Sequence, residues 1–122
     1  MGVIRPGVRL WLEDQGSPVF GSGICQLLAG VRSTGSLHRA AADMKMAYSK
    51  AWTIVQRAEK HLGLQLIERQ VGGAAGGGSV LTQDGLSLIA AFETWAERSR
   101  RAADDLFEET FPDRLKGIAP GS

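Results

Sequence analysis

The sequence has few of the residues from which disulfides and metal centres are built. Its 122 residues include one cysteine, Cys25, and two histidines, His38 and His61. A single cysteine excludes an internal disulfide and any zinc site made of cysteine pairs. The histidines are far apart in the sequence, and no acidic residue stands at a metal-ligand spacing from either of them. We therefore expect no metal and no cofactor.

The sequence also lacks any combination of residues typical of an enzyme. There is no serine–histidine–aspartate arrangement and no carboxylate pair arranged for acid–base catalysis, and the acids at 104, 105, 108 and 109 cluster on a solvated turn near the C-terminus. The glycine-rich run at 72–79 has no lysine, which a phosphate-binding loop needs, and it stands between two expected strands. We expect no enzyme activity and interpret this run as the flexible tip of a hairpin.

Long apolar runs are missing as well. No stretch approaches the roughly 20 apolar residues of a membrane span, and residues 1–16 lack the apolar core of a secretory signal. The composition, 43% hydrophobic and 22% charged, is that of an ordinary globular protein with room for one domain. These features predict a cytoplasmic protein that makes no membrane contact.

Charge is unevenly distributed along the chain. Residues 1–71 carry nine lysines and arginines against five acids, a net charge of +4, and residues 72–122 carry five against eight, a net charge of −3. A basic front half suits contact with a polyanion such as nucleic acid.

The spacing of apolar residues predicts a mostly helical fold with a small β wing. Glycine and N-cap residues mark the ends of the helices, as at Gly35–Ser36, Gly63 and Thr82. The expected order is β-α-α-α-β-β-α: a strand over 8–12, helices over 23–35, 37–44 and 48–62, strands over 64–71 and 79–81, and a long helix over 82–107. We assign 1–110 to one winged helix-turn-helix domain for DNA binding and dimerisation, and 111–122 to a flexible tail.

The second and third helices resemble the two helices of a helix-turn-helix, in which the second lies in the major groove. Small residues at 40–42 allow close packing, and Ala51, Trp52, Val55 and Ala58 predict a buried stripe on the third helix. The polar side chains then face outward, and they are of the types that reach base edges and phosphates. The predicted DNA-binding residues are Ser36, Arg39, Tyr48, Ser49, Lys50, Thr53, Gln56, Arg57 and, at the wing, Arg69. An ordinary helical hairpin with a solvated polar face is the alternative.

The last helix carries two apolar stripes, one of them with the 3.5-residue period of a helix–helix seam. One stripe can cover the domain's own core, and the second favours a partner copy. The predicted dimerisation residues are Leu88, Phe92, Trp95 and Leu106. The alternative is a helix wholly buried on its own domain.

Several segments together resemble a known family of DNA-binding domains: RLWLE, TGSLHRAAADMKMAY, KAW and LIERQVGGAAGGGSVLTQDG. Over roughly residues 8–107 the chain is similar to the N-terminal domain of the ModE molybdate-responsive regulators, and more distantly to LysR-type regulators. The resemblance implies a winged helix-turn-helix, homodimerisation through the first and last helices, and binding to a two-fold operator.

The chain departs from the family pattern at three places. The family continues into a molybdate-binding region, whereas this sequence ends at Ser122, so we expect no molybdate binding and a separate protein as any effector sensor. Ala47 stands where the family usually has a serine cap, and Ser49 stands at an often basic position. Two functions remain open: a homodimeric, sequence-specific regulator that binds double-stranded DNA, and a winged-helix interaction module with little DNA affinity.

Overall fold

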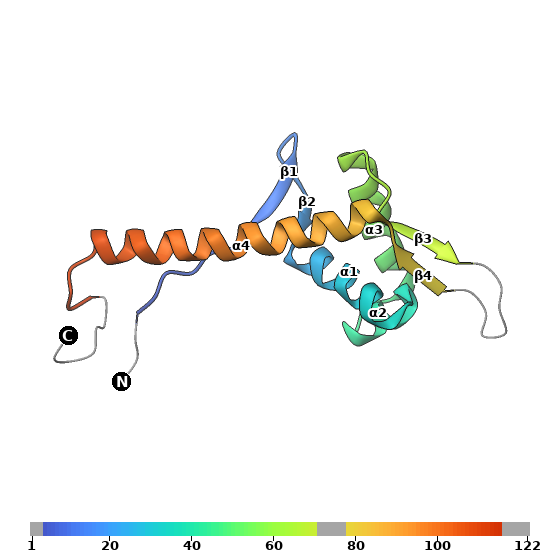
Figure 1. The fold of residues 1–122 in the computed structure, drawn as a ribbon, viewed down its shortest axis with the longest axis horizontal. Helices are drawn as coiled ribbons and strands as arrows, with labels where there is room; N and C mark the ends of the chain where they lie inside the picture. Colours follow the sequence, from blue (N-terminus) through green and yellow to red (C-terminus); the bar gives the residue numbers. More distant parts are fainter. Residues whose placement is uncertain (1–3, 71–77, 116–122) are drawn as a thin grey trace. The chain divides into compact units, whose positions relative to one another are not determined.

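The computed structural model describes residues 4–70 and 78–115 (Figure 1). It divides the chain into two compact units, residues 10–92 and residues 1–9 with 93–122, which are considered separately below. The elements are β1 (Trp11–Asp14), β2 (Ser17–Gly21), α1 (Ser22–Thr34), α2 (Leu37–Asp43), α3 (Tyr48–Leu62), β3 (Ile67–Gln70), β4 (Gly78–Leu81) and α4 (Gln83–Thr110). The mostly helical fold with a small β wing is confirmed.

The N-terminal part of the fold is a hairpin where the sequence predicted a single strand over 8–12. Strands β1 and β2 pair antiparallel, with Asp14 opposite Ser17. The two residues between them, Gln15 and Gly16, have φ angles of 51° and 81°. Positive φ at both positions is the geometry of a two-residue hairpin turn. The element order therefore gains one strand before the first helix.

The helices begin and end close to the predicted residues. Helix α1 ends at Gly35, which has a φ of 74°, and the hydroxyl of Ser36 accepts a hydrogen bond from the backbone N–H of Arg39 at 3.0 Å. Helix α3 ends at Gly63, with a φ of 68°. The predicted caps at Gly35, Ser36 and Gly63 are confirmed.

The core lies between α1, α2, α3, the wing and the start of α4. Ala51, Val55 and Ala58 of α3 have no exposed surface, which confirms most of the predicted stripe. Trp52 was expected in that stripe and is only partly buried. Its position one residue beyond Ala51 rotates it about 100° around the helix, to the flank of the buried face.

The wing is the antiparallel pair β3 and β4, in which Ile67 lies opposite Leu81 and Gln70 opposite Gly78. The predicted glycine tip at 72–77 lies outside the described residues. In β4, the backbone N–H of Ser79, which lies opposite Arg69, donates to the carbonyl of Gly35 at 2.9 Å. This bond ties β4 to the corner between α1 and α2.

Helix α4 begins with a Thr82 cap, as the sequence predicted. The Thr82 hydroxyl accepts from the N–H of Gly85 at 2.9 Å and donates to the carbonyl of Gln65 at 2.5 Å. A Cβ placed on Gly85 would lie 2.4 Å from the carbonyl oxygen of Leu66. Thr82 and Gly85 therefore dock the start of α4 on the connection between α3 and β3.

Candidate nucleic-acid interface

The corner between α2 and α3 is tight and leaves the start of α3 exposed. Lys45 occupies the left-handed region with a φ of 56°, and the N–H of Met46 donates to the carbonyl of Ala41 at 2.9 Å. Met44 and Met46 are half-buried against the core, as expected for apolar residues flanking the turn. The chain therefore reverses over few residues, with one helix braced against the next.

The outer face of α3 carries most of the predicted DNA-binding side chains. All of them are exposed: Tyr48, Ser49, Lys50, Thr53, Gln56 and Arg57. The hydroxyl of Thr53 donates to the carbonyl of Ser49 at 3.0 Å, so its methyl group and its acceptor lone pairs are what it presents to a ligand. The face is polar and basic on the side opposite the buried alanines.

The acid of α3 is turned away from this face. Glu59 is half-buried, and its Oε2 accepts hydrogen bonds from the N–H of Leu66 at 2.8 Å and of Ile67 at 3.3 Å. Its charge therefore stabilises the entry into β3. No other acid occurs in the helix, so its outer face carries positive charge alone.

The N-terminus of α3 has no side-chain cap. Ala47 occupies the N-cap position, and the first backbone bond of the helix runs from the N–H of Ala51 to the carbonyl of Ala47 at 3.0 Å. The N–H groups of the first turn before Ala51 therefore have no acceptor within the helix. Together with the helix dipole, such groups favour a phosphate.

Two further predicted residues lie at the start of α2. Arg39 is exposed, and Ser36 is half-buried with its hydroxyl engaged in the cap. The exposed hydroxyls of α3 are therefore better placed to reach a ligand than that of Ser36.

The flank of α3 carries an aromatic cluster that the sequence did not predict. The indole N–H of Trp52 donates to the Tyr48 hydroxyl at 2.6 Å, and the guanidinium carbon of Arg69 lies 4.8 Å from the centroid of the Trp52 ring. The rings of Tyr48 and His38 lie 5.2 Å apart between centroids. The cluster joins α2, α3 and β3, and the signal in the sequence was the spacing of four between Tyr48 and Trp52.

The predicted dimerisation residues fall into two groups. Phe92 is 6% exposed and packs edge-on against Phe20, with 5.3 Å between ring centroids, and Leu88 is half-buried against the same core. Trp95 and Leu106 are 39% and 60% exposed. The seam expected from the period of 3.5 is therefore corrected: Phe92 serves the core of its own chain, because α4 closes that core before Glu93.

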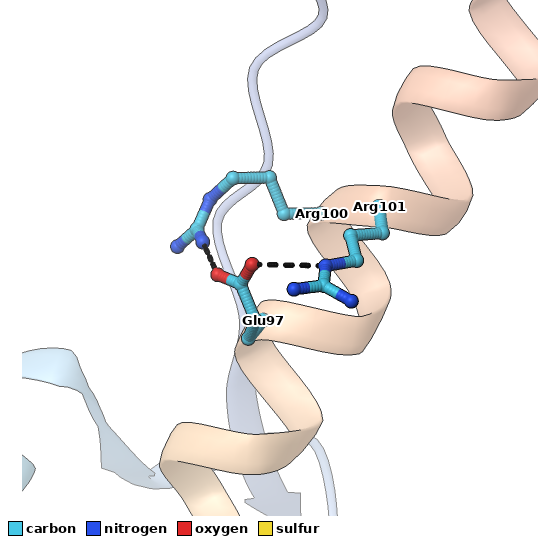
Figure 2. A network of polar contacts seen from close by, with 3 residues as sticks. All are labelled: Glu97, Arg100 and Arg101. Atoms are coloured by element: carbon cyan, nitrogen blue, oxygen red, sulfur yellow. Dashed lines mark hydrogen bonds and ion pairs between the residues drawn. The ribbon is translucent and has the colours of Figure 1, made fainter.

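Beyond Phe92, polar contacts run along α4 itself. Glu97 contacts Arg100 one turn on and accepts from Nε of Arg101 at 3.2 Å (Figure 2). These pairs are exposed, so each stabilises the helix by only about 0.2–0.5 kcal/mol. No helix in residues 4–70 and 78–115 is long and apolar enough to cross a membrane.

A helix-turn-helix followed by a two-stranded wing and a further helix defines a winged helix-turn-helix domain, a class of DNA-binding domains. A model of the bacterial regulatory helix-turn-helix proteins of the lysR family matches residues 25–86. The chain belongs to this family, which consists of transcription regulators and not of enzymes. The predicted likeness to LysR-type regulators is confirmed.

Individual relatives confirm the predicted likeness to ModE. The chain is 35% identical over 94 residues to the molybdenum transport protein ModE of Herbaspirillum seropedicae, covering 76% of this chain and 34% of that protein. It is 32% identical over 83 residues to the DNA-binding transcriptional dual regulator ModE of Escherichia coli K12, covering 68% and 32%. It is 42% identical over 66 residues to the molybdenum-pterin-binding protein MopB of Rhodobacter capsulatus, covering 54% and 24%.

A solved structure shares the fold. The crystal structure of ArgP from Mycobacterium tuberculosis superposes with a TM-score of 0.50 at 20% identity, over 68% of this chain and 29% of that one. The chain spans between about a quarter and a third of the length of these curated relatives.

Proposed function

We propose that the chain is a sequence-specific regulator that binds double-stranded DNA as a homodimer, with α3 in the major groove. The observation that carries the proposal is the outer face of α3. It is exposed, polar and basic from Tyr48 to Arg57, and the acid of the helix is turned into the fold. Such a face suits both the base edges and the phosphates of one groove.

The residues of α3 divide by their distance from the N-terminus of the helix. Recognition helices contact base edges mainly with their N-terminal residues. We therefore assign base contacts to Ser49, Lys50 and Thr53. Arg57 lies about two turns further on, where a helix leaves the groove, and we assign it to the phosphate backbone together with Gln56.

Tyr48 and three residues outside α3 complete the proposed contact surface. Arg39 and Ser36 lie at the start of α2, which crosses the backbone in this class of domain. The hydroxyl of Tyr48 accepts from Trp52, so its own O–H remains able to donate to a phosphate. Arg69 projects from the wing, and we assign it to the neighbouring backbone.

Selection from random genomic fragments, followed by titration at several salt concentrations, tests these assignments. Arg57→Ala should weaken binding to operator and scrambled DNA alike and lower the salt slope by about one unit. Lys50→Ala should cost about 1–3 kcal/mol on the operator and relax the preference at one base pair. If no sequence is enriched and neither variant changes affinity, the chain is an interaction module with little DNA affinity.

The homodimer is proposed from α4. Beyond Phe92 this helix exposes Trp95 and Leu106, and a two-fold pair of chains could bury both against a second copy. Sedimentation should show a dimer at tens of micromolar, and Leu106→Asp should shift it toward monomer. A wild-type chain that stays monomeric at that concentration would contradict the proposal, because its association free energy would then be smaller than about 6 kcal/mol.

The cellular location follows from the proposed ligand, DNA. A regulator that binds bacterial chromosomal DNA works in the cytoplasm, which we propose as its location. The names of several relatives refer to molybdenum. That ligand is a property of those relatives, of which this chain matches about a third or less.

A further inference from the structure

We propose that Trp52 is a positioning residue, which with Tyr48 holds the guanidinium of Arg69 beside the recognition helix. The inference rests on the proposed DNA-binding function. It adds to that function the contact that fixes the position of the Arg69 guanidinium relative to α3. Trp52 itself need not touch DNA. Its role is to determine where the charge of Arg69 meets the phosphate backbone.

The indole of Trp52 is a platform with a fixed orientation. Its N–H donates to the Tyr48 hydroxyl at 2.6 Å, and the Tyr48 ring meets it edge-on at 80°, with 6.4 Å between centroids. Tyr48 and Trp52 lie four residues apart, so one helical turn supports both rings. The hydrogen bond selects one rotation of the indole, which leaves a ring face toward β3.

Arg69 lies over that face. Its guanidinium carbon is 4.8 Å from the ring centroid, within the roughly 6 Å over which a cation–π attraction acts. In the described part of the chain, no carboxylate forms an ion pair with Arg69. Stacking on a ring face leaves the edge of the guanidinium and its N–H donors able to bind a phosphate.

The cluster connects the wing to both helices of the helix-turn-helix. The His38 ring of α2 lies 5.2 Å from that of Tyr48, and Tyr48 is the first residue of α3. A long, exposed arginine on a two-stranded hairpin would otherwise lose side-chain entropy on binding a phosphate. The stack restrains Arg69 before DNA arrives, which lowers that cost.

The geometry can be tested without DNA through the indole N–H resonances of the ¹⁵N-labelled chain. Trp52→Phe identifies the Trp52 resonance by its disappearance. Tyr48→Phe removes the acceptor and Arg69→Gln removes the stacked cation, so each should shift that resonance. Lys60→Ala, at an exposed position about two turns further along the same helix, is the control and should leave it in place. A Trp52 resonance unchanged by Tyr48→Phe and Arg69→Gln would overturn the cluster.

The function can be tested by a double-mutant cycle on DNA affinity. Arg69→Gln and Trp52→Leu should each weaken binding about fivefold at ~0.15 M salt and lower the salt slope by about one unit, the effect of one phosphate contact. The double variant should be no weaker than either single one, because both remove the same contact. Trp52→Phe, which keeps a ring face, should recover most of the affinity.

The outcomes separate this inference from the proposed function. If Arg57→Ala behaves as the loss of a phosphate contact but the affinity losses of the Trp52 and Arg69 variants multiply to about 25-fold, the positioning role is wrong and DNA binding stands. An unchanged salt slope in Trp52→Leu would likewise contradict the positioning role and show that Trp52 acts only through packing. If the wild-type chain shows no salt-dependent DNA binding, the function and the positioning role fail together.

Discussion

The two parts of helix α4, before and after Phe92, differ in how much of their surface is buried. Up to Phe92 the helix contributes Gly85, Ile89 and Phe92 to the core. The buried apolar side chains among residues 4–70 and 78–115 all lie between Val19 and Phe92. From Glu93 to Leu115 no residue is buried. Among the described residues, six of the nine exposed large apolar side chains belong to the unit of residues 1–9 and 93–122: Ile4, Val8, Trp95, Leu106, Phe111 and Leu115.

The difference indicates what each part of α4 is for. Helices in proteins derive most of their stability from packing an apolar face, and propensity alone leaves short ones marginal. The first turns of α4 have that packing within the chain, and the later turns keep apolar side chains exposed. In the proposed homodimer, a second copy covers the exposed surface of Trp95 and Leu106. The comparison supports the proposed homodimer. The first part of α4 completes the core of its own domain, and the outer part would contact the second chain.

The largest effect is expected at the place where α4 docks. Gly85→Val should destabilise the fold by about 3 kcal/mol or more, because a Cβ there meets the backbone carbonyl of Leu66, which cannot move aside. Urea unfolding followed by circular dichroism measures the change. Gly23→Ala in α1 is the matched control: its Cβ would meet no atom within 4 Å, so stability should rise by about 0.5–1 kcal/mol.

The next effect compares two apolar residues on the same helix. Ile89→Ala should lower the free energy of unfolding by about 2–5 kcal/mol, since Ile89 has no exposed surface. Leu106→Ala, at a residue that is 60% exposed, should change it by less than about 0.5 kcal/mol in dilute monomer. The same Leu106 variant should weaken self-association in sedimentation. Equal losses of monomer stability would contradict the division of α4 at Phe92.

A smaller gain is expected at the start of the recognition helix. Ala47→Ser should stabilise the fold by about 1 kcal/mol, because a serine hydroxyl can accept one of the unbonded N–H groups of the first turn. Thermal unfolding measures the gain. Ala42→Ser, on an exposed position inside α2, offers no such group and should not stabilise the fold. An Ala47→Ser variant without gain would mean that those N–H groups already have acceptors.

The smallest effect is expected in the outer part of α4. Glu97→Gln should change stability by no more than about 0.5 kcal/mol, because its pairs with Arg100 and Arg101 are exposed (Figure 2). The change should disappear in high salt. A loss of 2 kcal/mol or more, far above that roughly 0.5 kcal/mol limit, would show that these charges rather than apolar side chains hold the outer helix.

Sequence reasoning predicted the features that depend on local patterns. Glycine and cap residues marked the ends of α1 and α3, and Ser36 and Thr82 cap helices as expected. It missed β2, because Gln15–Gly16 is a less common hairpin turn than Asn–Gly, and a single strand already accounted for the alternation before it.

The errors at Trp52 and Phe92 have a common cause. Both residues fit an apolar stripe, and a stripe does not say how much of the helix circumference the rest of the chain covers. Around α3 the packed core does not extend as far as Trp52, whose ring contacts Arg69 instead. Along α4 the rest of the domain packs against the helix as far as Phe92. Phe92 is therefore part of the core and not of an interface between two helices. Such limits depend on contacts between elements distant in the sequence.

We propose that each chain binds one half-site with α3 and that two chains, joined through the outer part of α4, bind the two halves of the operator together. The most direct test of this proposal is a titration of the wild-type chain and Leu106→Asp on the selected two-fold operator and on its isolated half-site. We expect the wild-type chain to bind the operator at least about tenfold more tightly than the half-site, with half-sites one helical turn or a multiple apart. Leu106→Asp should bind both equally, at the half-site affinity. A wild-type chain that binds operator and half-site alike would contradict the account.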